Sequence, residues 1–254
     1  MKLKLLILSL VFFMSNLLWS QAFEKPVVSD SAYTIPLFKA SYAVQLTGAD
    51  MADRFGANNN VGGSFAVKTK KNWYYGIKGN FLWGATVRQN NILDQLKDSD
   101  GMIINSEGKP TEVFFDQRGS SFFLVGGRLF NVLAPNKNSG FLVYGGVGAL
   151  QHKISIKFQG KINSLTDEHK KGYDRFSFGY AVNAFAGYMY LSKNRLINFF
   201  GGVDLTQGWT KSLRKFNYDT GMPDNKVNSD FLYGFRVGWI IRLNKRTQEE
   251  FYYY

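Results

Sequence analysis

The strongest constraint on the fold is an alternation of apolar and polar side chains over stretches that are long for strands. Residues 73–88 place aromatic and aliphatic side chains at odd positions, whereas Lys78 and Arg88 fall at even positions. Strands of soluble proteins average about five or six residues, but a tilted strand needs about nine to eleven to cross a membrane. This stretch therefore predicts a membrane-crossing β-strand.

Eight stretches follow this pattern, some less regularly, and the connections between them alternate in length. The stretches are residues 39–47, 61–69, 73–88, 119–130, 141–152, 176–190, 198–209 and 231–243. Short turns are expected at 70–72, 134–139 and 192–194, and long loops at 48–60, 89–117, 157–175 and 211–230. Outer-membrane barrels place short turns in the periplasm and long loops outside. The prediction is an all-β fold, an eight-stranded antiparallel up-and-down transmembrane β-barrel with periplasmic turns and four extracellular loops.

A soluble barrel of the lipocalin type is the main alternative, and it would place apolar side chains inside and polar ones outside. The charged residues of a strand fall on one face, as Lys78 and Arg88 do in one strand and Arg236 and Arg242 in another. The opposite face of each strand carries large aromatic residues. Trp and Tyr also stand near both ends of the long strands, as in the aromatic girdles of membrane barrels. These features favour the membrane barrel.

The first residues indicate export. Lys2 and Lys4 precede an almost unbroken apolar stretch at residues 5–18, and Ser20 precedes a polar segment. This order is typical of a secretory signal peptide, and the stretch is shorter than the about 20 residues of a membrane helix. We expect a cleaved signal peptide at 1–20, a periplasmic segment at 21–38, the barrel at 39–243 and a periplasmic tail at 244–254, in the bacterial outer membrane.

The composition narrows the chemistry. The absence of Cys excludes thiol catalysis and Cys-ligated metal sites. The only histidines are His152 and His169, and neither a GxSxG nor an HExxH motif occurs. We therefore expect no enzymatic activity, catalytic residue, metal or cofactor. The net charge of +12 suits anionic outer-membrane lipids, including lipopolysaccharide, or an acidic partner, rather than nucleic acid, which an exported protein seldom meets.

The polar strand positions predict the content of the barrel. An eight-stranded barrel is just wide enough for side chains to fill, so polar residues opposite the apolar face should form a packed network around Asp204 as its single acid. The predicted lumen residues are Lys78, Asn80, Arg88, Arg128, Asn183, Asp204, Arg236 and Arg242.

Two segments outside the strands are candidates for partner binding. The long loop at 89–117 carries more apolar residues than a solvated loop needs, including Ile103, Ile104, Phe114 and Phe115. It is expected either to fold over the barrel mouth as a lid or to pack on a neighbouring protein. The chain ends in Phe251, Tyr252, Tyr253 and Tyr254 after a charged spacer. Exposed aromatic residues of this kind are favoured interface anchors.

Several short motifs carry a family resemblance over nearly the whole mature chain. They are residues 48–56 (GADMADRFG), 68–73 (KTKKNW), 138–141 (NSGF), 151–154 (QHKI), 171–175 (KGYDR) and 251–254 (FYYY). With these motifs the chain resembles a family of outer-membrane β-barrel proteins from Bacteroidota. The resemblance implies an outer-membrane barrel with an accessory role, and it supplies no catalytic residues.

Four functions remain open at this point. The leading hypothesis is a non-enzymatic accessory subunit of an outer-membrane assembly, either a protein-insertion or a secretion machine, with other outer-membrane or periplasmic subunits as partners. An autonomous barrel that binds surface ligands or acts as an adhesin through its loops is the alternative. A small-solute channel and a lipid-modifying enzyme follow in that order.

Overall fold

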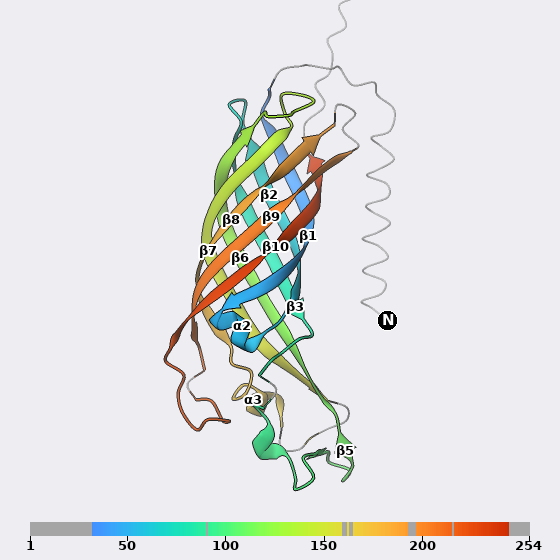
Figure 1. The fold of residues 1–254 in the computed structure, drawn as a ribbon, viewed down its shortest axis with the longest axis vertical. Coiled ribbons are helices and arrows are strands. Elements are labelled where there is room, and N and C mark those ends of the chain that lie inside the picture. Colours follow the sequence, from blue (N-terminus) through green and yellow to red (C-terminus); the bar gives the residue numbers. More distant parts are fainter. Residues whose placement is uncertain are drawn as a thin grey trace, which may run out of the picture.

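Eight long strands close into one antiparallel barrel (Figure 1). The computed structural model describes residues 32–89, 91–158, 162, 165–192, 197–214 and 216–243. The strands are β1 (Ile35–Ala49), β2 (Asn58–Lys68), β3 (Trp73–Gly84), β6 (Val113–Phe130), β7 (Gly140–Phe158), β8 (Ser177–Leu191), β9 (Asn198–Ser212) and β10 (Val227–Arg242). Their order around the barrel is β1-β10-β9-β8-β7-β6-β3-β2, and β1 also pairs with β2. The expected eight-stranded, up-and-down barrel is confirmed.

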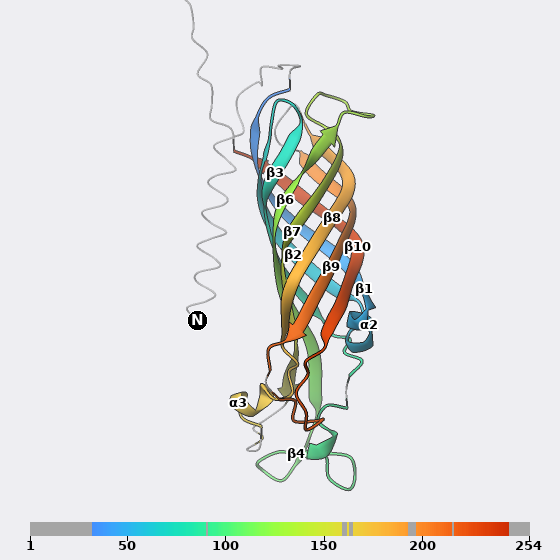
Figure 2. The ribbon, with the colours of Figure 1, turned by 90° about the vertical axis from the view of Figure 1, so that its left-hand side faces the viewer.

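The two ends of the barrel differ, as the alternation of short and long connections predicts. One end, which we call the turn end, carries the connections 69–72, 131–139 and 192–197. The other, the loop end, carries the long connections 50–57, 85–112, 159–176 and 213–226. The short elements α2 (Asp50–Arg54), η1 (Asp94–Leu96), β4 (Ile103–Ile104), β5 (Pro110–Thr111) and α3 (Asp167–Lys170) all belong to the loop end (Figures 1 and 2).

The outer surface of the barrel is apolar. On β3, Trp73, Tyr75 and Phe81 are exposed, whereas Tyr74 and Leu82, at alternate positions, are buried. Trp73 and Trp83 stand near the two ends of β3. At about 3.3 Å per residue and a tilt of about 40°, they are about 25 Å apart along the barrel axis, the height of the apolar band of outer-membrane barrels. Such a surface is unfavourable in water and suits a lipid environment.

Two strands are longer than the sequence pattern predicts. β6 pairs with β3 only as far as Gln117, and β7 pairs with β8 only as far as His152. Beyond these residues β6 and β7 pair with each other alone, up to the pair of Val113 with Phe158. We call this two-stranded extension above the rim the overhang. It contains Phe114 and Phe115, which were expected in the loop.

Several expected boundaries differ or lie outside the described residues. β1 begins at Ile35 rather than Lys39, because residues 35–38 already pair with β2. The signal peptide at 1–20 and the tail at 244–254, with Phe251, Tyr252, Tyr253 and Tyr254, lie outside the described residues. Within the described part of the chain, no helix has the length and apolar character needed to span a membrane.

Candidate functional site

The centre of the lumen contains an ion pair that joins opposite walls. Lys78 Nζ on β3 lies 2.8 Å from Asp204 Oδ1 on β9, and these strands are four places apart in the ring of eight. From neighbouring β10, Arg236 donates to Asp204 Oδ2 through Nε at 2.9 Å and Nη2 at 2.8 Å. All three side chains are at least 96% buried. Burial in a low-dielectric interior is tolerated here because each charge has an opposite charge in contact.

Neutral polar side chains complete this centre. Asn183 Nδ2 donates to Asp204 Oδ1 at 3.1 Å, and Asn183 Oδ1 accepts from Lys78 at 3.1 Å. Arg236 donates to Asn60 Oδ1 at 3.1 Å and to Ser41 Oγ at 2.9 Å. The group, which we call the central network, therefore draws on β1, β2, β3, β8, β9 and β10 and crosses the lumen in several directions.

A glycine makes room for the guanidinium. A Cβ atom at Gly62 of β2 would lie 2.4 Å from Asn80 Oδ1 and 3.1 Å from Arg236 Nη1. Any larger residue would therefore displace one of these polar groups. The strand carries Gly at this position because Arg236 occupies the space that a side chain would need.

A layer of aromatic rings lies beside the central network and surrounds another cation. Lys39 of β1 is 2% exposed, and its Nζ lies 4.5 Å from the centre of the Tyr74 ring, 4.6 Å from Phe200 and 5.4 Å from Tyr144. The negative faces of these rings can stabilise the ammonium group. Tyr144 belongs to β7, which is opposite β1 in the ring. The aromatic layer and the central network therefore both reach from wall to wall.

A third polar layer closes the turn end. Lys68 Nζ donates to Asn138 Oδ1 at 2.9 Å. Arg242 donates to Tyr33 Oη at 3.2 Å and to Asn198 Oδ1 at 2.7 Å, and it also contacts the carbonyl of Ser192. These bonds tie the start of the described chain to β2, β9 and β10.

The loop end of the lumen contains a buried pair of His152 and Asp230. His152 Nε2 lies 2.9 Å from Asp230 Oδ2, and the Thr210 hydroxyl donates to the same oxygen at 2.5 Å. In a nucleophilic triad the hydroxyl would bond to the histidine and the acid would orient the histidine's other nitrogen. Here both groups address one carboxylate oxygen. The Thr210 hydroxyl also lies 3.5 Å from His152 Nε2, and the three side chains link β7, β9 and β10.

Six of the eight predicted lumen residues lie inside the barrel. Asn80, Lys78, Asn183, Asp204 and Arg236 are buried, and Arg242 faces the lumen at the turn end. All except Asn80 and Arg242 belong to the central network. Asn80 donates to Ser121 Oγ at 3.0 Å on the neighbouring strand β6.

Arg128 is not in the lumen, contrary to the prediction. It is exposed on the outer face of β6, where its guanidinium lies 5.5 Å from the Trp73 ring and 5.9 Å from the Phe130 ring. The prediction was wrong because Gly and apolar residues occupy both faces of β6, so its alternation was ambiguous. Near the end of the strand, a long cation can rest on aromatic rings while its charge reaches the polar interface.

Arg88 is also outside the lumen. β3 ends at Gly84, and residues 86–88 instead pair with the segment after α2, where Gly56 donates to the carbonyl of Thr86 and Arg88 to that of Arg54, both at 2.9 Å. The exposed Arg88 side chain donates to the carbonyl of Ala52 at 2.7 Å. The prediction was wrong because the alternation of apolar and polar residues continues in the sequence beyond Gly84, where the chain leaves the barrel.

Several interior residues were missed. Asp204 is not the single acid, since Asp230 is also 1% exposed inside the barrel. Lys39 and Asn60 were not assigned to the lumen, although Lys39 falls on the same face of β1 as the buried Gln45. Asp230 is the last residue of the expected loop 211–230, where no alternating pattern shows which way a side chain points.

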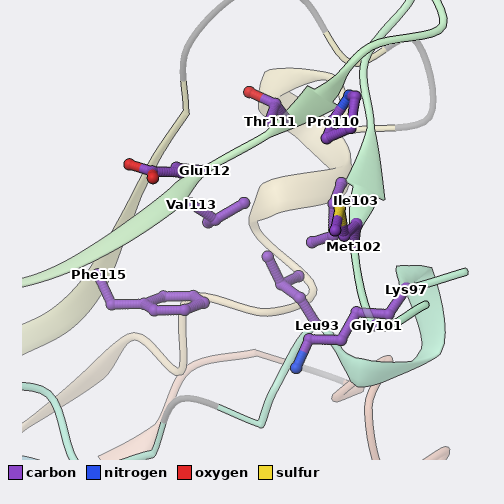
Figure 3. Close-up of a pocket in the computed structure, with 10 residues that line it drawn as sticks. All are labelled: Leu93, Lys97, Gly101, Met102, Ile103, Pro110, Thr111, Glu112, Val113 and Phe115. Atoms are coloured by element: carbon purple, nitrogen blue, oxygen red, sulfur yellow. The ribbon is translucent and has the colours of Figure 1, made fainter.

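The loop end carries an apolar pocket of about 490 Å³ built on the overhang. It lies between η1, the β4–β5 hairpin and the start of β6, and Figure 3 shows Leu93, Ile103 and Val113 turned toward the same space. Phe115 forms one side, and Lys97 and Glu112 supply charged groups. We call this the hairpin pocket.

The four predicted partner-binding residues of this loop divide into two pairs. Ile103 is 7% exposed and Phe115 packs against the core, so both support the loop from within. Ile104 and Phe114 are exposed, as is Met102 at the edge of the pocket. The loop thus has a buried apolar side, as a lid would, and an exposed apolar side. Among the described residues, no group of acidic or histidine side chains could hold a metal ion.

The chain was compared with known proteins. No protein-family model and no curated protein matches it. Solved structures with a similar fold include Ail, the attachment invasion locus protein of Yersinia pestis, in complex with the heparin analogue sucrose octasulfate, with 11% identity, a TM-score of 0.34, and coverage of 82% of this chain and 99% of that one. The outer membrane protein OprG of Pseudomonas aeruginosa shows 14% identity, a TM-score of 0.36, and coverage of 83% and 97%. Both likenesses concern the fold, which the strand order of this chain establishes on its own.

Proposed function

We propose that this chain is a sealed, non-enzymatic barrel of the bacterial outer membrane that binds an apolar segment of a partner protein at its loop end. The observation that carries the proposal is the hairpin pocket, with Met102 exposed at its edge and with Ile104 of β4 and Phe114 of the overhang also exposed. Exposed apolar surface of this kind often marks a contact with a partner.

The outer surface supports the location. Large apolar residues face outward on all eight strands, among them Phe38, Phe65, Ile77, Leu124 and Val143. Closure of the barrel leaves no unpaired strand edge, which is the condition for β-structure in lipid. In the outer membrane the loop end would face outward and the turn end the periplasm. Exposed Lys153 and Lys211 near the loop end would then meet the anionic groups of lipopolysaccharide.

The interior supports a sealed barrel rather than a channel. The central network and the aromatic layer around Lys39 each connect opposite strands. A channel would need a continuous path through these side chains. The geometry of His152, Asp230 and Thr210 gives no support to hydrolysis or acyl transfer.

The overhang makes the pocket a suitable docking element. Ile154 and Ile156 of β7 are buried, and so are Ile92 and Leu93 of the loop itself, and all four belong to the apolar core. A pre-formed pocket avoids the entropy cost of ordering a loop on binding. The size, about 490 Å³, falls within the about 300–1,000 Å³ typical of small binding pockets, which suits one or two apolar side chains of a partner.

Site-specific cross-linking would test this proposal. A photoreactive amino acid at Met102 in intact cells should give one dominant cross-linked protein, and Phe115→Ala or Ile104→Asp should reduce its yield at least fivefold. The same photoreactive group at Lys109, which lies in the β4–β5 turn and is 74% exposed, serves as the control. Equal patterns at both positions, or none at Met102, would refute the proposal.

The accessory role in a protein-insertion or secretion machine is a narrower form of the same proposal. It requires a stable complex, whereas an autonomous adhesin requires only a surface partner. Purification in mild detergent distinguishes them, because a machine subunit should co-purify with other outer-membrane or periplasmic proteins. Removal of residues 251–254 tests the contribution of the tail. The resemblance to barrels of Bacteroidota favours the accessory role.

A further inference from the structure

A second hollow at the loop end differs in chemistry from the hairpin pocket. It has a volume of about 420 Å³ and lies between α2, the segment after β3, the β7–β8 connection and the β9–β10 loop. We call it the mouth cleft. Polar and charged side chains dominate its lining, and Met222 and Pro223 are the apolar members.

The walls of the mouth cleft are held in place by their own bonds. Asp50 accepts from the backbone N–H of Ser229 at 2.7 Å and from Lys226 Nζ at 3.0 Å, and these two contacts, the first above all, hold the pKa of Asp50 below its usual range. Arg54 donates to Ser177 Oγ at 3.3 Å. The cleft is therefore a built feature of the folded loops, not a gap between mobile side chains.

Four side chains that line the cleft carry a buried polar atom with no hydrogen-bond partner among the residues that the structure describes. Asn217 Oδ1 and Gln89 Oε1 are acceptors, whereas Asn228 Nδ2 and Arg175 Nε are donors. Asn217 and Asn228 are 2% and 3% exposed. Buried polar groups are nearly always paired, and each unpaired one is costly. Four of them in the wall of one cleft point to a polar ligand.

The charges of the cleft decide between ligand classes. Three cationic side chains, Arg54, Arg175 and Lys226, face three acidic ones, Asp50, Asp53 and Asp224, so the lining has no net charge. Arg54 lies 3.5 Å from Asp224, and Arg175 is paired with Asp219. A phosphate or sulfate group would compete with these carboxylates. A neutral ligand that both donates and accepts hydrogen bonds would not compete with the carboxylates for the cationic side chains.

We infer that the mouth cleft binds a neutral saccharide. Each sugar hydroxyl both donates and accepts, and pairs of neighbouring hydroxyls match planar amide, carboxylate and guanidinium groups, which dominate this lining. Met222 and Pro223 supply an apolar ledge for the C–H face of a sugar ring. The inference does not rest on the hairpin pocket, because the two lining sets share no residue.

Direct binding measurements on the full chain would test this site. The protein is refolded in a detergent without a sugar headgroup and titrated with maltose, lactose, N-acetylglucosamine and a sulfated disaccharide. We expect saturable binding of at least one neutral probe, weakened at least tenfold by Asn228→Ala and by Gln89→Ala. Lys109→Ala in the exposed β4–β5 turn, which lines neither hollow, is the control and should leave the affinity unchanged.

Heat-modifiable migration in gels verifies that each variant is folded, and Gln89→Ala covers the case in which Asn228→Ala fails to fold. Competition by purified lipopolysaccharide of the producing cell would identify its own surface glycan as the source, and competition only by foreign glycans would indicate an external one. Binding of the sulfated probe alone, or of no probe, would overturn the inference, as would an equal loss of affinity in Lys109→Ala.

Discussion

Lys78 and Asp204 form an ion pair across the full width of the barrel, with 2.8 Å between Nζ and Oδ1 and with their strands diametrically opposed. The pair therefore joins two walls of the barrel that share no backbone hydrogen bond. Because both groups are removed from water, its effect on stability depends on which partner is changed.

Replacing Asp204 should strongly destabilise the barrel. Asp204→Asn leaves Lys78 and Arg236 as buried cations without a counter-charge, and we expect a loss of about 3–5 kcal/mol in the free energy of unfolding. Urea-dependent unfolding in lipid vesicles measures this value. Lys153→Met, a change of an exposed cation on β7, is the control and should change it by less than about 0.5 kcal/mol.

The triple change Lys78→Met, Asp204→Leu and Arg236→Met removes all three charges together. Well-packed apolar residues often replace buried ion groups without loss, so this variant should be more stable than Asp204→Asn. A triple variant as unstable as Asp204→Asn would show that volume, not charge, governs the site.

Lys39 offers a test of the aromatic layer. Lys39→Met keeps most of the side-chain volume between Tyr74, Tyr144 and Phe200 and removes a buried charge, so stability should be retained or raised. Lys39→Ala leaves a cavity and should cost about 2–4 kcal/mol. The same unfolding assay compares them, and equal destabilisation by both changes would mean that the cation itself is required.

The filled lumen should prevent conduction. The folded wild-type chain is expected to leave a planar bilayer electrically silent, because the central network and the aromatic layer both span the lumen. The double variant Lys78→Ala and Arg236→Ala opens only the central network and should stay silent, whereas adding Tyr74→Ala and Tyr144→Ala opens both layers and should produce measurable current. Regular single-channel steps in the wild type would contradict the sealed interior.

The contact of Asp50 with Ser229 should depend on pH. The pKa of Asp50 is lowered, chiefly by the hydrogen bond from the Ser229 backbone and then by Lys226. Its contribution to the loop-end structure is therefore complete above its unfolded pKa of about 3.9 and is lost as the pH falls through its lower folded pKa. The amide resonance of Ser229 should report this titration.

Two variants give the comparison. Asp50→Asn removes the carboxylate, and the acid-dependent shift of the Ser229 resonance should disappear, whereas Asp98→Asn in the separate β3–β4 loop should leave it intact. A Ser229 resonance that titrates equally in Asp50→Asn would assign the effect to another group.

The strands were predictable because a membrane barrel imposes a rule that every strand obeys. Lipid outside and a polar lumen inside require alternation, so Tyr75, Phe81 and Lys78 each indicate their own orientation. Where both faces of a strand carry the same kinds of residue, the alternation does not show which face points inward. For that reason Arg128 was assigned to the lumen although it lies on the outer face. Arg88 failed differently, since an alternation cannot show where a chain leaves the barrel.

The sequence by itself determined the number of strands, their antiparallel order and the inward face of the most regular strands, because these depend only on the local period and on the lengths of the connections. The tertiary structure alone decided which polar residues meet. Lys78 is 126 positions from Asp204 in the chain, and Lys39 reaches Tyr144 from the opposite wall. Such contacts depend on the ring closure and register of eight strands. The mouth cleft likewise exists only where four separate loop-end segments converge.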